Sequence, residues 1–139
     1  MTPTSADNLT PLRARRDAWL DRVRTLVDQV EEWAKAEHWV PERHQERIQE
    51  QFLGEYEAPA LRITVPIEGV PDGQLLLTPI ALQVGGEQGR VDLRAIPTMS
   101  RVRLLAGPDG WRMIAGSNIP LRLPWARETF VQLAQDLLS

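Results

Sequence analysis

The sequence has no cysteine, a single lysine and two histidines among its 139 residues. The lack of cysteine excludes disulfide bonds, cysteine nucleophiles and thiolate metal sites, and it is typical of proteins in a reducing compartment. The chain has no apolar run near the roughly 20 residues needed to cross a bilayer. Its start, MTPTSADNLT, also lacks the apolar core of a secretory signal. We therefore expect a cytoplasmic protein with no membrane partner.

Length and composition predict one folded domain. A chain of 139 residues can bury one core and is too short for two well-packed ones. Hydrophobic residues make up 42% of it and charged residues 25%, as is ordinary for a globular protein. We interpret residues 1–9, which are mostly polar, as a flexible N-terminal tail and residues 10–139 as a single α+β domain.

A long amphipathic helix is predicted after this tail. Thr10 suits the N-cap and Pro11 the first helical position, where the N–H that proline lacks has no partner anyway. The face that carries Arg22 is expected to lie in solvent. Pro41 ends the helix, because the residue before a proline avoids the α conformation. Apolar residues at spacings of three and four form the buried stripe: Trp19, Leu20, Val23, Leu26, Val27, Val30, Trp33 and Ala34.

Residues 41–53, PERHQERIQEQFL, allow two interpretations. Most of them are strong helix formers, and Gly54 suits the position after a helix end. Ile48 and Phe52 also fit a period of two, which is typical of a polar edge strand. We favour a short helix here and keep the edge strand as the alternative.

From residue 58 onward the pattern is that of β-strands. ALRITVPIEG alternates apolar and polar residues as a half-buried strand does, and QLLLTPIALQV is apolar enough for a central strand. VDLRAI, RVRLLA and WRMIAG follow as shorter strands. The connectors GVPDG, GGEQG and PDG are turn sequences and are too short for crossover helices. We therefore predict an antiparallel meander of about five strands.

The C-terminal segment PWARETFVQLAQDLLS predicts a second amphipathic helix that begins at Pro124. With the first helix and the meander, it gives an α+β fold with both helices on one sheet face. Its inward face is predicted to consist of Ala126, Phe130, Leu133, Ala134 and Leu137.

Charge is segregated along the chain, although the net charge is −3. Residues 28–57 contain nine acidic and three basic residues, whereas residues 90–127 contain seven arginines and two aspartates. Fifteen of the sixteen basic residues are arginine. The planar guanidinium suits carboxylates and phosphates, but a coding bias toward arginine gives the same count. The pattern predicts that the basic segment binds either the acidic segment or another molecule.

Asp92 is one candidate for chemistry. An acid on this strand, with Glu31, Glu32 or Glu37 on the preceding helix, resembles the metal site of restriction-endonuclease-like nucleases. The resemblance implies a metal-dependent hydrolase or nuclease-like domain around Asp92. Such families place an acid, one spacer and a lysine on the next strand, but that strand reads RVRLL here, and the single lysine is Lys35. We therefore favour Asp92 as an ion-pair partner of the arginines near it: Arg90, Arg94 or Arg101.

The remaining catalytic patterns are incomplete. His38 and His44 are six residues apart across a predicted break, and they suit capping or solvated positions better than metal ligation. Ser100 and Ser117 lie in connectors with no visible base. GGEQGR lacks the ending of a phosphate loop and connects two strands. We predict no catalytic residue, no metal and no cofactor.

An arginine-lined sheet face is the stronger candidate. Alternation places its arginines on the face away from the helices: Arg90, Arg94, Arg101, Arg103 and Arg112. We expect a small, non-catalytic, bacterial-type interaction protein that binds another protein or self-associates through its acidic and basic surfaces. The alternative is a nucleic-acid-binding module that uses this face. An acidic net charge and the lack of aromatic residues in the stripe weigh against it. A third interpretation is that the acidic residues 42–57 fold across the basic face and balance it.

Overall fold

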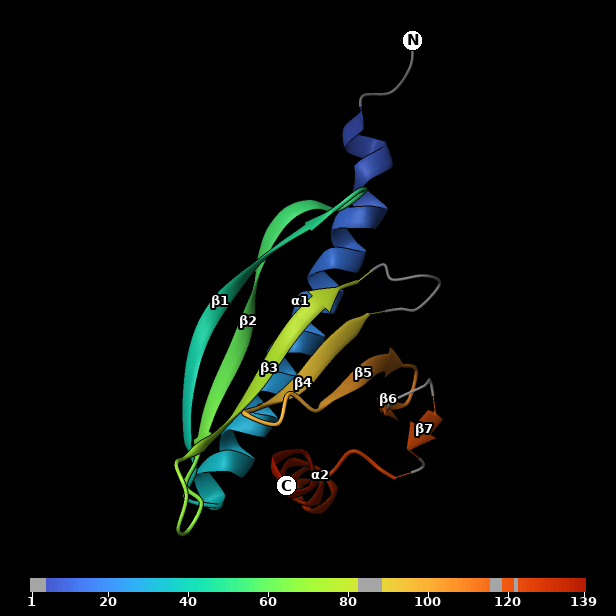
Figure 1. Cartoon of the computed structure of the whole chain (residues 1–139). Coiled ribbons are helices and arrows are strands. Elements are labelled where there is room, and N and C mark those ends of the chain that lie inside the picture. Colours follow the sequence, from blue (N-terminus) through green and yellow to red (C-terminus); the bar gives the residue numbers. More distant parts are fainter. Residues whose placement is uncertain (1–4, 83–88, 116–118, 122) are drawn as a thin grey trace.

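The computed structural model describes residues 5–82, 89–115, 119–121 and 123–139. Two helices and a seven-stranded antiparallel sheet form within them, with the strands in sequence order across the sheet (Figure 1). The predicted α+β meander is confirmed, and its strands outnumber the five expected. The elements are α1 (Ser5–Ala36), β1 (Val40–Glu50), β2 (Gly54–Val65), β3 (Gly73–Ala81), β4 (Arg90–Ile96), β5 (Arg101–Gly107), β6 (Gly110–Ala115), β7 (Ile119–Leu121) and α2 (Arg127–Leu138).

Helix α1 begins earlier than the sequence predicts. It starts at Ser5, so Pro11 lies inside the helix and the predicted start at Thr10 and Pro11 is wrong. Proline removes one backbone hydrogen bond, a local cost that a 32-residue helix with a buried face accommodates. Residues 1–4 of the predicted tail lie outside the described residues.

The end of α1 is set by its own backbone and not by Pro41. The N–H of Trp39 donates to the carbonyl of Ala34 at 2.9 Å, and the N–H of His38 donates to the carbonyl of Lys35 at 3.0 Å. These two hydrogen bonds form a Schellman motif. In this motif the first residue after the helix adopts the left-handed conformation and is usually glycine. His38 takes that conformation with φ 63°. The sequence pattern did not predict this helix end, because histidine occupies the position where glycine usually marks it.

Residues 40–50 form the edge strand β1, so the short helix favoured for residues 41–53 is wrong. Each residue of β1 pairs with one of β2, from Val40 opposite Thr64 to Glu50 opposite Gly54. The hairpin turn ends at Gly54, which has φ 74°. Pairing along a whole neighbouring strand outweighs the helix propensity of individual residues. The charged residues and Pro41 also suit an edge, since they discourage pairing with other chains.

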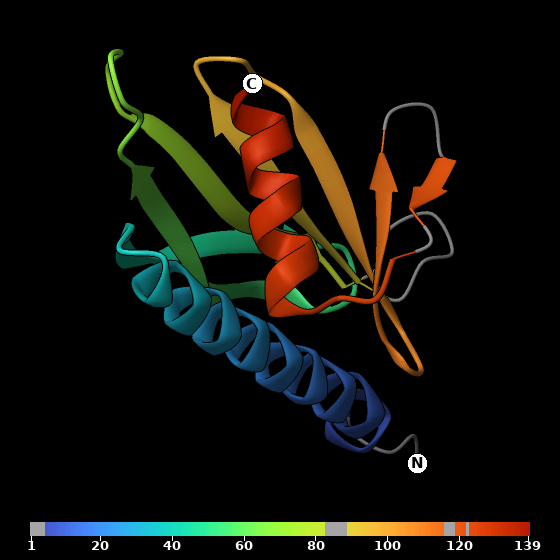
Figure 2. The same ribbon diagram turned by 90° about the horizontal axis from the view of Figure 1, so that it is seen from below.

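Both helices pack on the same face of the sheet, as predicted. Figures 1 and 2 show the sheet curving around them, with the β1–β2 hairpin arching over α1. All five tryptophans belong to the core between the helices and the sheet or pack against it. No helix in the described part of the chain is long and apolar enough to span a membrane.

Helix α2 begins at Arg127, three residues after the predicted Pro124. The Thr129 hydroxyl accepts a hydrogen bond from the Ala126 N–H at 3.0 Å, which satisfies a donor at the helix start. The centre of the Phe130 ring lies between 5.7 and 6.2 Å from the centres of three tryptophan rings, close enough for favourable tilted and edge-to-face contacts. The predicted inward face is confirmed for Phe130, Leu133, Ala134 and Leu137, which are buried.

Candidate functional site

The outer face of β4, β5 and β6, which lies away from the helices, carries the predicted arginines. On β4 and β5 the apolar residues that alternate with them, Val91, Leu93, Val102 and Leu104, are buried in the core. A strand side chain between two core-facing neighbours points to the opposite face. The surface that we call the basic face therefore consists of Arg90, Arg94, Arg101, Arg103 and Arg112.

Strand register brings these arginines together. Arg94 lies directly opposite Arg101 across β4 and β5, and Asp92 lies opposite Arg103. Leu105 lies between Arg90 and Arg112, since it pairs with both. The basic face is thus a continuous patch with apolar positions among its cations.

Asp92 acts as a counterion within this patch. Arg90 donates two hydrogen bonds to its carboxylate, at 2.7 and 3.0 Å, and Arg101 lies 3.7 Å from the same group. The hydrogen bond to Asp92 raises the pKa of Arg90 above its ordinary value. Asp92 is 8% exposed, so this pairing satisfies a buried charge. The ion-pair role predicted for Asp92 is confirmed. Among the described residues no three acidic, histidine or cysteine side chains gather as metal ligands would.

A depression of about 350 Å³ opens on the basic face. It is lined by Arg94, Arg101, Arg103, Met99 and Ile114. Met99 lies in the β4–β5 turn and is 60% exposed. The sequence predicted the arginines but not these two apolar residues, because a turn methionine and an isoleucine near a sheet edge carry no local signal for a shared surface.

The β4–β5 turn is held firmly beneath the depression. The Thr98 hydroxyl donates to the backbone carbonyl of Leu137 in α2 at 2.5 Å. The N–H of Ala95 donates to the carbonyl of Ser100 at 2.8 Å, and the N–H of Met99 to the carbonyl of Ala95 at 2.9 Å. These bonds fix the position from which Met99 projects into solvent.

The acidic segment does not fold across the basic face, so the third interpretation is wrong. Its strand β1 is at the far edge of the sheet, and at about 4.8 Å per strand β4 is about 14 Å away and β5 about 19 Å away. Its charges pair locally: Arg47 lies 3.2 Å from Glu55, and His44 lies 2.9 Å from Glu46.

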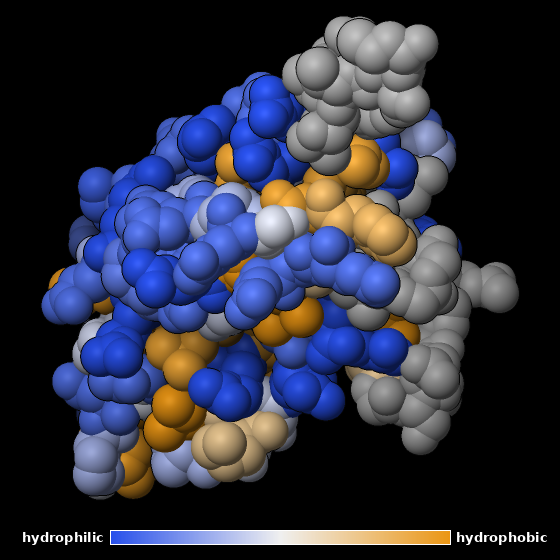
Figure 3. Space-filling model, turned by 90° about the horizontal axis from the view of Figure 1, so that it is seen from above, coloured by the Kyte–Doolittle hydropathy of each residue, from blue (hydrophilic) through white to orange (hydrophobic). Residues whose placement is uncertain are grey.

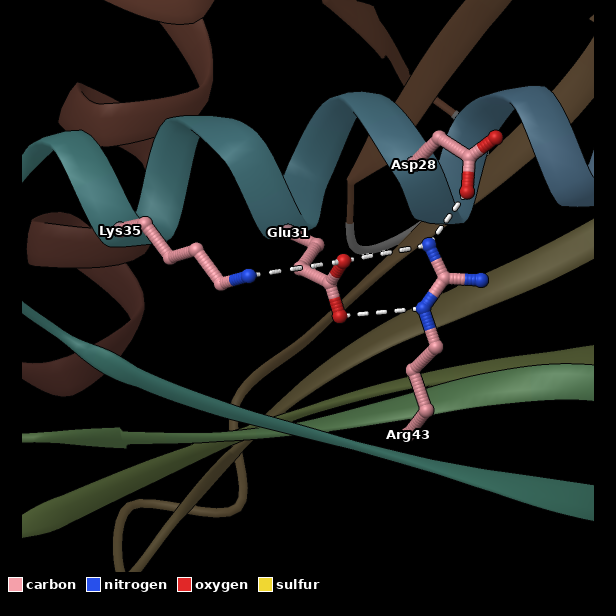
Figure 4. Close-up of polar contacts among 4 residues, drawn as sticks. All are labelled: Asp28, Glu31, Lys35 and Arg43. Atoms are coloured by element: carbon pink, nitrogen blue, oxygen red, sulfur yellow. Dashed lines mark hydrogen bonds and ion pairs between the residues drawn. The ribbon is translucent and has the colours of Figure 1, made fainter.

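Other acids of this segment pair across the contact between α1 and β1. Arg43 reaches from β1 to α1, where it donates to Asp28 and, at 3.0 Å, to Glu31 (Figure 4). Lys35 lies 3.9 Å from Glu31 on the same helix. The hydrogen bond from Arg43 lowers the pKa of Glu31. Lys35 and Arg43 thus supply counterions from within the acidic segment, and Arg127 of the basic segment supplies another, 2.8 Å from Glu37.

A buried polar network joins α1 to the hairpin. The Glu50 carboxylate, 9% exposed, accepts hydrogen bonds from the Tyr56 hydroxyl and from the backbone N–H of Leu82, the latter at 3.0 Å. The Trp19 indole donates to the Tyr56 oxygen at 3.2 Å. Burial and the adjacent carboxylate raise the pKa of Tyr56. Sequence patterns missed this network because its members come from α1, β1, β2 and the residue after β3.

Arg22 is half-buried, so the prediction that it lies on the solvated face of α1 is wrong. Its guanidinium donates to the carbonyls of Gly107 and Gly110, at 2.8 and 3.2 Å, and stacks over the Trp111 ring. It therefore ties α1 to the β5–β6 hairpin. Only the tertiary contact between these elements makes this role visible.

Another hollow of about 270 Å³ lies between α1 and the β1–β2 turn. It is lined by Leu12, Arg13, Arg16 and residues 52–54, and Phe52 is 61% exposed. Figure 3, which views this end of the molecule, shows exposed apolar surface among hydrophilic side chains. Nothing in the described residues indicates what covers it.

The structure describes some of the remaining candidate residues, and others lie outside the described part of the chain. His38 ends α1 and His44 pairs with Glu46, as expected of capping and solvated histidines. Ser100 lies in the β4–β5 turn. Ser117, Arg122 and most of the predicted GGEQG turn lie outside the described residues.

No family model, curated protein or solved structure matches this chain. We therefore argue function from the surfaces that the structure describes and from their chemistry. Among the described residues, the basic face combines clustered arginines with the apolar side chains of Met99 and Ile114.

Proposed function

We propose that the chain is a non-catalytic protein-binding domain whose basic face docks on an acidic surface of another protein. The observation that carries this proposal is the depression lined by Arg94, Arg101 and Arg103 together with the apolar residues Met99 and Ile114. Arginine and methionine are enriched in protein interfaces, where arginine pairs with carboxylates and methionine adapts to apolar partners.

Composition of the face favours a protein over a nucleic acid. Among the described residues, its side chains include no aromatic ring on which bases could stack, since all five tryptophans belong to the helix-side core or pack against it. The net charge of −3 also opposes a long nucleic-acid backbone outside this patch.

The charge pattern favours a different protein over a second copy. Two basic faces packed against each other would place arginines opposite arginines, which costs free energy. Asp28 and Glu31 of α1 already pair with Arg43 and Lys35, and Glu55 of β2 pairs with Arg47. An acidic partner protein therefore complements the basic face better.

Affinity capture with matched charge variants tests this proposal. The bait is the full chain, either wild type, the double variant Arg94→Gln/Arg101→Gln, or the control Arg13→Gln/Arg15→Gln, which removes the same charge from the exposed surface of α1. We expect a partner retained by wild type and control and lost by the double variant. Binding of that purified partner should weaken about tenfold between 50 and 200 mM salt, because exposed charge pairs are screened.

Three outcomes would contradict the proposal. The first is equal retention of the partner by both double variants. The second is loss of the captured protein after nuclease treatment, which would assign the face to a nucleic acid. The third is turnover of a defined substrate that a single substitution abolishes.

A further inference from the structure

Arg94 and Arg101 face each other as like charges, and among the described residues the acid near them is Asp92, 3.7 Å from Arg101. The two residues are direct cross-strand neighbours in β4 and β5, and like charges in such positions destabilise a sheet. Both side chains line the depression on the basic face. A bound anion between them would turn this repulsion into attraction.

The balance of charge at this place favours a dianion over a single carboxylate. The outer face of β4 and β5 carries four arginines against one aspartate, Asp92. That aspartate accepts two hydrogen bonds from Arg90 and also lies 3.7 Å from Arg101, so two arginines share its single charge. A phosphate monoester carries about −1.5 to −2 charges at neutral pH and offers three acceptor oxygens, whereas a carboxylate carries one charge. Planar guanidinium groups bind such oxygens in pairs.

The apolar wall indicates what accompanies the anion. Met99, 60% exposed, and Ile114, 7% exposed, line the same depression as the arginines, so Met99 supplies most of its exposed apolar surface. Free phosphate has no apolar part to contact them, but a phosphorylated residue with an aliphatic neighbour does. The turn that carries Met99 is held by Thr98 to α2, so little ordering is needed when a ligand binds.

We propose that this depression binds a phosphorylated side chain of the partner protein, with the phosphoryl group between Arg94 and Arg101 and an adjacent aliphatic side chain on Met99 and Ile114. The proposal rests on the proposed function of the basic face as a protein-binding surface, and it specifies the partner's chemistry.

A peptide titration followed by amide NMR of the full chain tests it. The probes are three blocked five-residue peptides with leucine on both sides of a central serine, glutamate or phosphoserine, together with inorganic phosphate. We expect the amides of residues 94–103 to shift most with the phosphoserine peptide. The half-saturating concentration of the phosphoserine peptide should be about tenfold lower than that of the glutamate peptide or of inorganic phosphate.

Variants separate the charged part of the site from its apolar part. Arg94→Gln/Arg101→Gln should lower the affinity for the phosphoserine peptide by about tenfold or more. The control Arg13→Gln/Arg15→Gln should lower it by less than about twofold, since distant exposed charges are screened. Met99→Ser should lower the affinity for the phosphoserine peptide but leave the affinity for inorganic phosphate unchanged. Equal binding of the serine and phosphoserine peptides, or shifts centred away from residues 94–103, would overturn the proposal.

Phosphatase treatment distinguishes failure of this inference from failure of the proposed function. The captured partner is treated with phosphatase and its affinity for the wild-type chain is measured again. Loss of affinity supports the phosphoryl site. Undiminished binding that still depends on Arg94 and Arg101 would reject the phosphoryl site and leave the acidic docking surface standing.

Discussion

Alkaline pH should destabilise this protein through Tyr56, its single tyrosine. The Tyr56 side chain is buried, its hydroxyl donates to the Glu50 carboxylate, and its oxygen accepts from the Trp19 indole. Burial is the main reason why the pKa of Tyr56 is raised above its ordinary value, and the negative charge of Glu50 adds to it. The folded protein therefore retains this proton at a pH where an unfolded chain loses it.

The sign and size of the effect follow from proton linkage. The unfolded chain ionises its tyrosine near pH 10, and the folded chain does so only at higher pH. Stabilisation by the protonated hydroxyl is complete below the unfolded pKa and is lost as pH rises toward the folded pKa. Between these two values the free energy of unfolding should fall by about 1.4 kcal/mol for each pH unit.

Ultraviolet absorbance of tyrosinate measures the ionisation directly, because no other tyrosine contributes. The native protein should show no absorbance step near pH 10, and the step should appear when urea unfolds the chain at that pH. Tyr56→Phe is the control, since it removes the titrating group. This variant should lose about 1–3 kcal/mol at neutral pH, because Glu50 and Trp19 lose a partner, and its alkaline slope should be shallower. A native absorbance step at pH 10, or identical alkaline slopes, would refute the reasoning.

Three further substitutions test other contacts, each by urea unfolding. Gly89 has φ 127°, and a Cβ there would lie 2.8 Å from Trp19 Cε3, so Gly89→Ala should cost about 2–4 kcal/mol; a loss under about 0.5 kcal/mol would show that the ring moves aside freely. Arg22→Met should cost about 1–3 kcal/mol, because it removes two hydrogen bonds to the β5–β6 hairpin and the contact with Trp111; an unchanged midpoint would contradict that role. Arg43→Gln should cost less than about 1 kcal/mol, since its pairs with Asp28 and Glu31 are exposed. If the loss in free energy of unfolding were undiminished in 1 M salt, the pairs would not be screened as expected.

Periodicity alone predicted which face α1, α2, β4 and β5 turn to the core. Spacings of three and four gave the buried stripes of both helices, as Val23 and Phe130 illustrate. Alternation in β4 and β5 predicted Arg94 and Arg101 on the outer face, and both side chains lie there in the folded sheet. These predictions succeeded because helix and strand geometry repeats locally, so a short window of sequence contains the whole signal.

Tertiary structure alone decided which distant residues meet. It made residues 40–50 a strand by pairing them with β2, against their helix propensity, and it placed Arg22 on the β5–β6 hairpin. It set the acidic segment at the far edge of the sheet and gathered Met99 and Ile114 beside the arginines. Such contacts join residues far apart in the chain, and no local pattern records them. The sequence thus predicted a basic sheet face. Only the fold showed that the acidic segment does not cover this face and that the face contains a depression lined by arginine and apolar side chains.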